Sequence, residues 1–138
     1  MVARNFRPGL LRRGQVLVAG AGPVSNFLLA LLFTLALFVA LRVMAPSGTA
    51  ETAARILIAG VIVNVGLGVF NLVPLPPLDG AWVASFGLPP RMGESYDRVV
   101  RPYGTWILLI LVLSGALSAI TSPVIGFLIR WLYQIALP

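Results

Sequence analysis

One carboxylic acid, Asp79, stands in a segment that carries no other charge from Ile56 to Pro90. It comes near the end of the phrase Asn-Leu-Val-Pro-Leu-Pro-Pro-Leu-Asp-Gly, which runs from Asn71 to Gly80. An ionisable group among apolar residues is costly to place in lipid, so such a group marks a candidate functional site. The function of the chain therefore depends on what the Asp79 carboxylate binds.

The residues before Asp79 predict a break in the backbone. Pro74, Pro76 and Pro77 cannot all lie in one continuous helix. Irregular backbone at membrane depth is tolerated only where it is buried in protein or lines a wet cavity. We therefore expect Asp79 on non-helical or newly restarted chain. The alternative is a proline-rich loop at the membrane edge, in which Asp79 merely caps a helix over Gly80–Phe86.

The composition places this segment in a membrane. The chain has 138 residues, of which 59% are hydrophobic and 10% charged, and its mean hydropathy is +0.97. These values exclude a water-soluble globule. There is no cysteine, so neither a disulfide nor a thiolate metal site is possible, and there is no histidine. The ten arginines lie at the edges of apolar runs, which indicates membrane topology and not a face that binds nucleic acid.

The apolar runs predict an all-α integral membrane protein with one membrane domain over residues 1–138. Three transmembrane helices are expected at about 16–42, 54–73 and 103–122, each near the ~20 residues that a bilayer requires. The proline-rich break follows the second of them. Proline suits a first turn, so Pro123 predicts a short C-terminal helix over about 124–137 that lies at the interface or inserts in part.

The arginines also predict an orientation in the cell membrane. With alternating sides, seven arginines face one way and three face the other. Cytoplasmic loops carry the excess of positive charge, so the N-terminus should be cytoplasmic. The second span then runs from the outside to the inside and places Asp79 near the cytoplasmic boundary of the membrane. The larger group consists of Arg4, Arg7, Arg12, Arg13, Arg91, Arg98 and Arg101.

Small and polar residues recur at helical spacing within the spans. Gly60, Asn64 and Gly68 share one helix face with Asn71. Small residues let helix backbones approach closely, and amides can form hydrogen bonds across the interface. We expect helix packing here. Asn26, one turn after Gly22 in the first span, either packs in the same way or faces the Asp79 site.

Two motifs together resemble a known family. Ala-Gly-Pro-Val-Ser-Asn, ending at Asn26, opens one span, and the phrase from Phe70 to Gly80 closes the next. This combination resembles the site-2 protease family of intramembrane zinc metalloproteases, as do flanking pairs such as Tyr103-Gly104. The resemblance covers nearly the whole chain.

The resemblance implies roles for the residues of both motifs. Asp79 would be a zinc ligand, and the Asn71 amide would stabilise the oxyanion of the reaction. The reaction would be attack of zinc-activated water on a peptide bond of a membrane-embedded protein. Substrate binding would involve Asn26 and the opened backbone held by Pro74, Pro76 and Pro77.

One part of the family pattern is missing. The family's other half-site is a helix with His-Glu-x-x-His, which supplies two zinc ligands and the general base. This sequence has no histidine, and its other acids are Glu51, Glu94 and Asp97. A catalytic zinc needs about three protein ligands. We therefore expect zinc in the intact family enzyme, none bound by this chain alone, and no proteolysis by this chain alone.

Several interpretations stay open at this point. The chain is a truncated copy, or has a mis-assigned start, or is one part of a split enzyme whose partner chain brings the histidine helix. It is otherwise a protease-dead membrane protein that binds or scaffolds transmembrane helices. A small channel or transporter subunit, with Asp79 on the ion path, is the remaining alternative.

Overall fold

The computed structural model describes residues 8–136, over which it forms helices and no strand. This confirms the all-α prediction. Arg4 and Arg7, on which part of the predicted orientation rests, lie outside the described residues, as do the side chains of Arg12 and Arg13. The elements are α1 (Pro8–Val43), α2 (Gly48–Asn71), α3 (Gly80–Gly87), α4 (Pro90–Leu113) and α5 (Ala116–Ala136).

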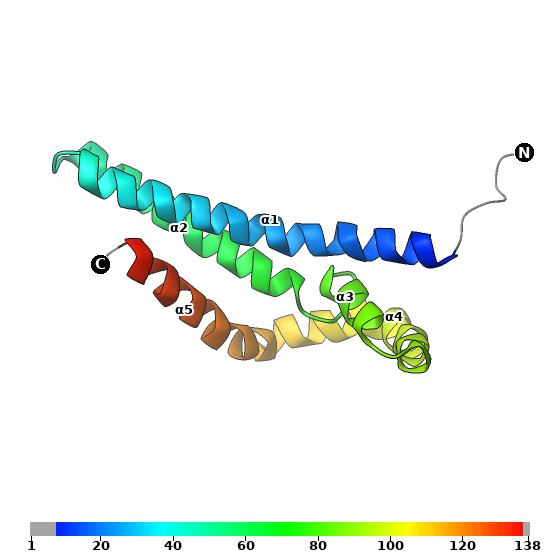
Figure 1. Cartoon of the computed structure of the whole chain (residues 1–138). Coiled ribbons are helices and arrows are strands. Elements are labelled where there is room, and N and C mark those ends of the chain that lie inside the picture. The colour runs from blue at the N-terminus through cyan, green and yellow to red at the C-terminus, as the bar shows by residue number, and fades with distance from the viewer. Residues whose placement is uncertain (1–7, 137–138) are drawn as a thin grey trace, which may run out of the picture.

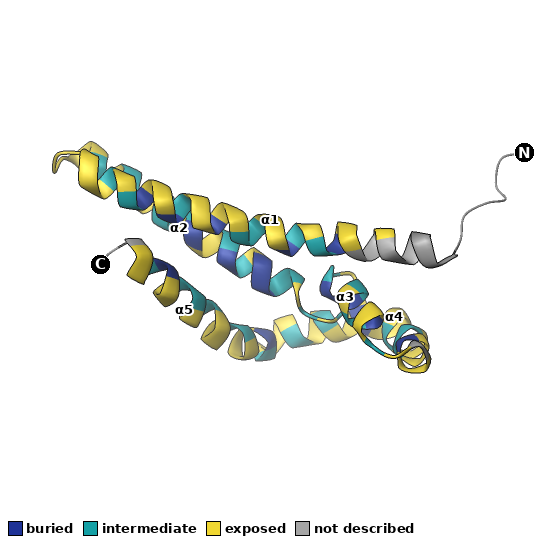
Figure 2. Ribbon diagram, in the orientation of Figure 1, coloured by how far each residue is buried: buried dark blue, intermediate teal, exposed yellow. Residues whose placement is uncertain are grey.

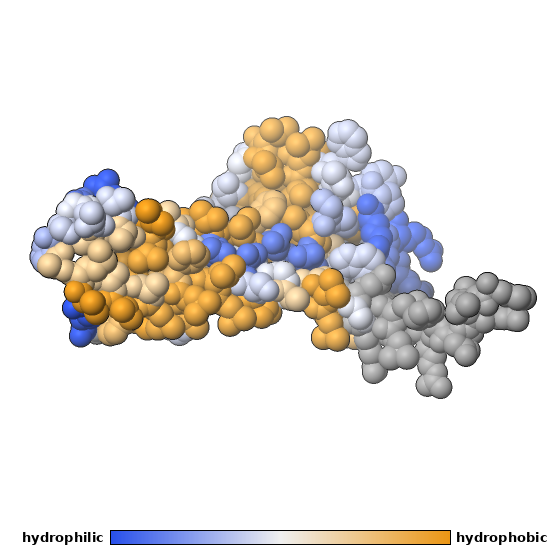
Figure 3. Space-filling view, turned by 90° about the horizontal axis from the view of Figure 1, so that it is seen from above, coloured by the Kyte–Doolittle hydropathy of each residue, from blue (hydrophilic) through white to orange (hydrophobic). Residues whose placement is uncertain are grey.

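Three of the described helices are long and apolar enough to cross a membrane. The candidate spans are Leu17–Val43 in α1, Gly48–Asn71 in α2 and Ala116–Ile135 in α5. Most of the surface of the long helices is exposed in Figure 2, and the body in Figure 3 is largely hydrophobic. Large apolar side chains on such a surface are suited to lipid. The protein is therefore an integral membrane protein.

Helices α1 and α2 form an antiparallel hairpin (Figure 1). The hairpin turns at Ser47, whose hydroxyl accepts a hydrogen bond of 3.3 Å from the Ala50 amide and so caps α2. Gly60 faces the ring of Phe33, and Gly68 faces the ring of Phe27. A methyl group added at either glycine would lie within 2.8 Å of ring carbon. The predicted packing through small residues is confirmed for these two glycines.

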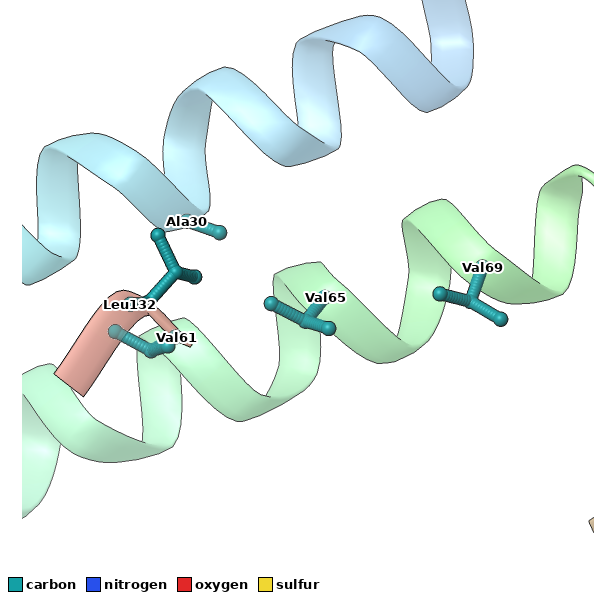
Figure 4. Close-up of a cluster of buried hydrophobic side chains, with 5 residues drawn as sticks. All are labelled: Ala30, Val61, Val65, Val69 and Leu132. Carbon is teal, nitrogen blue, oxygen red and sulfur yellow. The ribbon is translucent and has the colours of Figure 1, made fainter. Parts of the chain in front are cut away.

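A small apolar core extends this contact to the C-terminal helix. Ala30 of α1, three valines of α2 and Leu132 of α5 are buried together (Figure 4). The valines lie at successive turns on one side of α2, namely Val61, Val65 and Val69. The core therefore joins all three candidate spans.

Two polar side chains within this bundle form their hydrogen bonds with the backbone of their own helix. The Asn64 side-chain amide donates to the Gly60 carbonyl of its own helix at 2.8 Å, and the Thr34 hydroxyl donates to the Ala30 carbonyl at 2.9 Å. The prediction of a hydrogen bond across the interface is therefore wrong for Asn64. An amide that can reach a carbonyl one turn earlier in its own helix needs no partner in the next helix.

The C-terminal half differs from the prediction. Helix α4 ends at Leu113, and Gly115 has a φ of +74°, so the helical stretch expected at 103–122 is divided. Helix α5 then begins at Ala116 and contains Pro123 in its interior, so a helix start at Pro123 is wrong. Its 21 residues are long and apolar enough to span, in contrast to the short helix expected at 124–137. Glycine is favoured in a left-handed position after a helix, so it outcompetes the proline as the break point.

The remaining elements gather beside the N-terminal half of α1. Helix α3 packs on α1, and α4 packs on α3 and α5 (Figure 1). Because α2 runs antiparallel to α1, the end of α2 and the chain that follows it return to this same end of the molecule. Both motifs of the sequence meet here.

Candidate functional site

The segment between α2 and α3 is irregular. Helix α2 ends at Asn71, and residues 72–79 form a series of turns before α3 begins at Gly80. Backbone hydrogen bonds stabilise these turns. The Leu75 amide donates to the Val73 carbonyl at 2.8 Å, and the Leu78 amide donates to the Leu75 carbonyl at 2.9 Å. We call residues 72–79 the proline loop. It ends at Asp79, so the loop fixes where the carboxylate stands.

Asp79 occupies the N-cap position of α3 but does not act as a cap. Its side chain makes no hydrogen bond to the first turn of α3. The capping alternative raised by the sequence is therefore wrong. The carboxylate instead lies over Gly22 of α1, where an added methyl carbon would be 2.5 Å from Oδ2. Only a glycine leaves room for the carboxylate at this position of α1.

This contact brings the two sequence motifs together. Asp79 is half-buried and has no hydrogen bond or ion pair among the described residues. Its oxygens are thus uncommitted within that part of the chain. A half-buried carboxylate without a protein partner is suited to binding a cation, because carboxylate oxygens are good metal ligands.

Two amides lie in the same part of the molecule. Asn26 follows Gly22 by one helical turn, so both residues lie on the same face of α1. Asn71 ends α2 directly before the proline loop. Both side chains are half-buried, and neither forms a hydrogen bond with a described residue. The geometry thus leaves both amides available at this end of the hairpin.

Helix α4 braces the proline loop from another side. The Tyr96 hydroxyl donates a hydrogen bond of 2.5 Å to the Pro74 carbonyl. Gly104 faces the ring of Pro76, and a methyl group there would be 2.5 Å from the Pro76 Cδ. Sequence reasoning assigned no role to either residue. The glycine in the Tyr103-Gly104 pair was an available signal for a close approach, whereas nothing in the sequence indicates the Tyr96 contact.

The bond from Tyr96 requires a protonated hydroxyl. Burial raises the pKa of Tyr96 above its usual value of about 10, and the neighbouring Asp97 carboxylate raises it further, while Arg101 lowers it. The hydroxyl therefore remains a donor throughout the physiological range. This contact stabilises the proline loop at any pH that the protein meets in a cell.

The residues present do not complete a zinc site. No group of three or more His, Cys, Asp or Glu side chains that could hold a metal is found in the described part of the chain. Glu51 pairs with Arg55 at 2.6 Å, and Asp97 pairs with Arg101 at 3.1 Å. Asp79 fits the role of one ligand, but one carboxylate does not meet the requirement of about three protein ligands.

Comparison with known proteins shows the family of this chain. The model of the family described as Peptidase family M50 matches residues 39–115, which is more than half of the chain and includes the whole proline loop. The chain belongs to peptidase family M50, the site-2 protease family. The resemblance stated from the motifs is thereby confirmed.

A curated relative covers a longer stretch. The Bacillus subtilis (strain 168) protein named "Putative zinc metalloprotease YwhC" is 31% identical over 117 residues, which is 83% of this chain and 53% of the relative. The chain thus spans about half the length of this curated relative. No solved structure matches the chain.

Proposed function

We propose that this chain supplies the carboxylate half of the catalytic centre of a site-2 protease, which hydrolyses peptide bonds of membrane-embedded proteins. The observation that carries the proposal is the Asp79 carboxylate, which is seated over Gly22 and free of a capping role. Membership of family M50 supports the reaction class. The histidine ligands and the general base come from outside these 138 residues, either from the same polypeptide or from a second chain.

We assign a separate catalytic or binding role to each site residue of this chain. Asp79 serves as one zinc ligand, and Gly22 keeps the space that its carboxylate occupies. Zinc, when bound, supplies a Lewis acid that activates water toward a peptide carbonyl. The Asn71 amide donates a hydrogen bond to that carbonyl oxygen as negative charge develops on it. Asn26 and the loop residues Pro74, Pro76 and Pro77 form the side that receives the substrate.

The orientation is part of this proposal. The Asp79 end of the hairpin lies on the side of Arg91, Arg98 and Arg101, which we assign to the cytoplasm. The chain has no cysteine, so single cysteines can be introduced for labelling. A membrane-impermeant thiol reagent should label Thr49→Cys from outside intact cells and Ser95→Cys only after permeabilisation. The opposite pattern would reverse the orientation.

The catalytic role is tested in the assembly that includes the histidine-bearing segment. Asp79→Asn should lower zinc affinity by more than the ~10–100-fold that loss of a supporting contact costs, and should abolish cleavage of a transmembrane substrate. Gly22→Ala should displace the carboxylate and lower zinc affinity about 10-fold or more. Gly20→Ala is the matched control in the same helix, because a methyl group there meets nothing within 4 Å.

Three outcomes would contradict the proposal. Asp79→Asn with undiminished zinc content and cleavage would exclude the ligand role. Equal effects of Gly20→Ala and Gly22→Ala would show that the close approach is irrelevant. Ion flux through vesicles containing the chain alone, abolished by Asp79→Asn, would favour the channel alternative.

A further inference from the structure

A second candidate binding site lies between the proline loop, α3 and α4. It is a cavity of about 260 Å³ whose lining includes Pro76, Pro77, Trp82, Tyr96, Asp97 and Arg101. The residues that form the Asp79–Gly22 contact do not line it. The catalytic proposal makes no use of Arg101, Trp82 or Asp97.

The Arg101 side chain is fixed by contacts with Trp82 and Asp97. Its guanidinium carbon lies 3.8 Å from the centre of the Trp82 ring, and its Nε donates to the Asp97 carboxylate at 3.1 Å. No further hydrogen bond of this side chain occurs among the described residues. Stacking and the Nε bond fix the plane of the group and leave its two terminal nitrogens available. A guanidinium presented in this way matches the geometry of a phosphate.

The cavity lies near a membrane boundary. The candidate spans of α1 and α2 have one end in this region, and the cavity is built by the chain that follows α2. Beyond Arg101, α4 exposes Tyr103 and Trp106, and these residue types are common at the membrane interface. Arg91 and Arg98 precede Arg101 on the same helix. Basic pockets at the cytoplasmic surface attract the headgroups of anionic lipids.

We propose that this cavity binds the phosphate of an anionic phospholipid, with Arg101 as its anchor. A lipid fits better than a soluble anion, because the cavity lies where the candidate spans of α1 and α2 end, and the part of α4 beyond Arg101 exposes the interfacial residue types Tyr103 and Trp106. Pro76 and Pro77 belong both to the cavity and to the loop that ends at Asp79. A bound lipid therefore stabilises the loop that presents Asp79. This proposal rests on the cytoplasmic orientation proposed above but not on the catalytic role of Asp79.

The test uses the purified chain in a neutral detergent and short-chain lipids. Trp106→Phe and Trp131→Phe leave Trp82 as the single tryptophan, whose fluorescence reports on the cavity. Phosphatidylglycerol should change this fluorescence with saturation. Phosphatidylcholine should bind more weakly by about fivefold or more, and millimolar inorganic phosphate should not compete.

Two arginine variants separate the cavity from general surface charge. Arg98→Gln and Arg101→Gln each remove one charge from α4, so the non-specific attraction to phosphatidylglycerol falls equally. Arg98 does not line the cavity. Arg101→Gln should weaken binding by about tenfold more than Arg98→Gln does, because it also removes charge-assisted hydrogen bonds. Circular dichroism checks that both variants keep their helix content.

A third variant tests phosphate binding at the cavity if Arg101→Gln does not fold. Asp97→Asn keeps a side-chain oxygen that can accept from the Arg101 Nε but removes a negative charge beside the expected phosphate, so phosphatidylglycerol should bind more tightly by about twofold or more. Weaker binding after this change would overturn the proposal, as would equal losses in Arg98→Gln and Arg101→Gln. Competition by inorganic phosphate, or equal affinity for phosphatidylcholine, would also overturn it.

Discussion

The α1–α2 hairpin and the region from the proline loop to the first half of α4 are held together by different means. In the hairpin, glycines face aromatic rings across the interface, and Asn64 and Thr34 bond within their own helices. In the second region, a tyrosine side chain bonds to a loop carbonyl and an arginine stacks on a tryptophan. The hairpin thus depends on close apolar packing, whereas the loop region depends on specific polar contacts.

This difference follows from the backbone. Helices satisfy their own peptide groups, so two helices in lipid associate mainly through shape. The proline loop cannot satisfy its peptide groups in that way, so other elements must supply partners, as Tyr96 does for Pro74. The scaffold for Asp79 consequently consists of a continuous helix on the Gly22 side and of individual contacts on the α4 side.

The largest effect should come from filling the hairpin interface. Gly68→Ala places a methyl group 2.8 Å from the Phe27 ring, and we expect it to lower the free energy of unfolding by about 1–3 kcal/mol. Gly66→Ala, on the same helix, meets nothing within 4 Å and should be neutral or slightly stabilising. Thermal unfolding in detergent would measure both. Equal destabilisation would show that the hairpin does not depend on this close approach.

A smaller effect is expected where α4 meets the loop. Gly104→Ala brings a methyl group to 2.5 Å from Pro76, but a loop can shift more easily than a packed helix. We expect a loss of about 1 kcal/mol, with faster hydrogen exchange in α3 and α4 and unchanged exchange in the hairpin. Gly126→Ala, which meets nothing within 4 Å, is the control. Faster exchange in the hairpin as well would mean that the two regions open as one unit.

The smallest effect should come from the single hydrogen bond to the loop. Tyr96→Phe should cost about 0.5 kcal/mol, at the low end of the range for a hydrogen bond, because this one is exposed. Because the pKa of Tyr96 is raised in the folded protein, its contribution is fully present below about pH 10 and is lost as the pH rises through the folded value. The stability difference between parent and variant should therefore be constant from about pH 6 to 9 and shrink above 10. A difference that changes near neutral pH would contradict this assignment.

Sequence reasoning succeeded where one physical property decides the outcome. Hydropathy and run length identified an all-α membrane protein and the helices that became α1 and α2, since a span requires about 20 apolar residues whatever its neighbours are. It failed where two local signals compete. It placed the break at Pro123 and did not consider one at Gly115, whose positive φ shows that the helix ends there.

The sequence by itself determined the membrane class, the membership of family M50 and the candidacy of Asp79, because a lone acid and its motif can be recognised without coordinates. Only the tertiary structure decided that the carboxylate lies over Gly22 and not on the first turn of α3, and that Tyr96 and Gly104 hold the loop in place. The physical reason is that such contacts join residues far apart in the chain. Their distances depend on how the helices pack, which no local pattern of residues specifies.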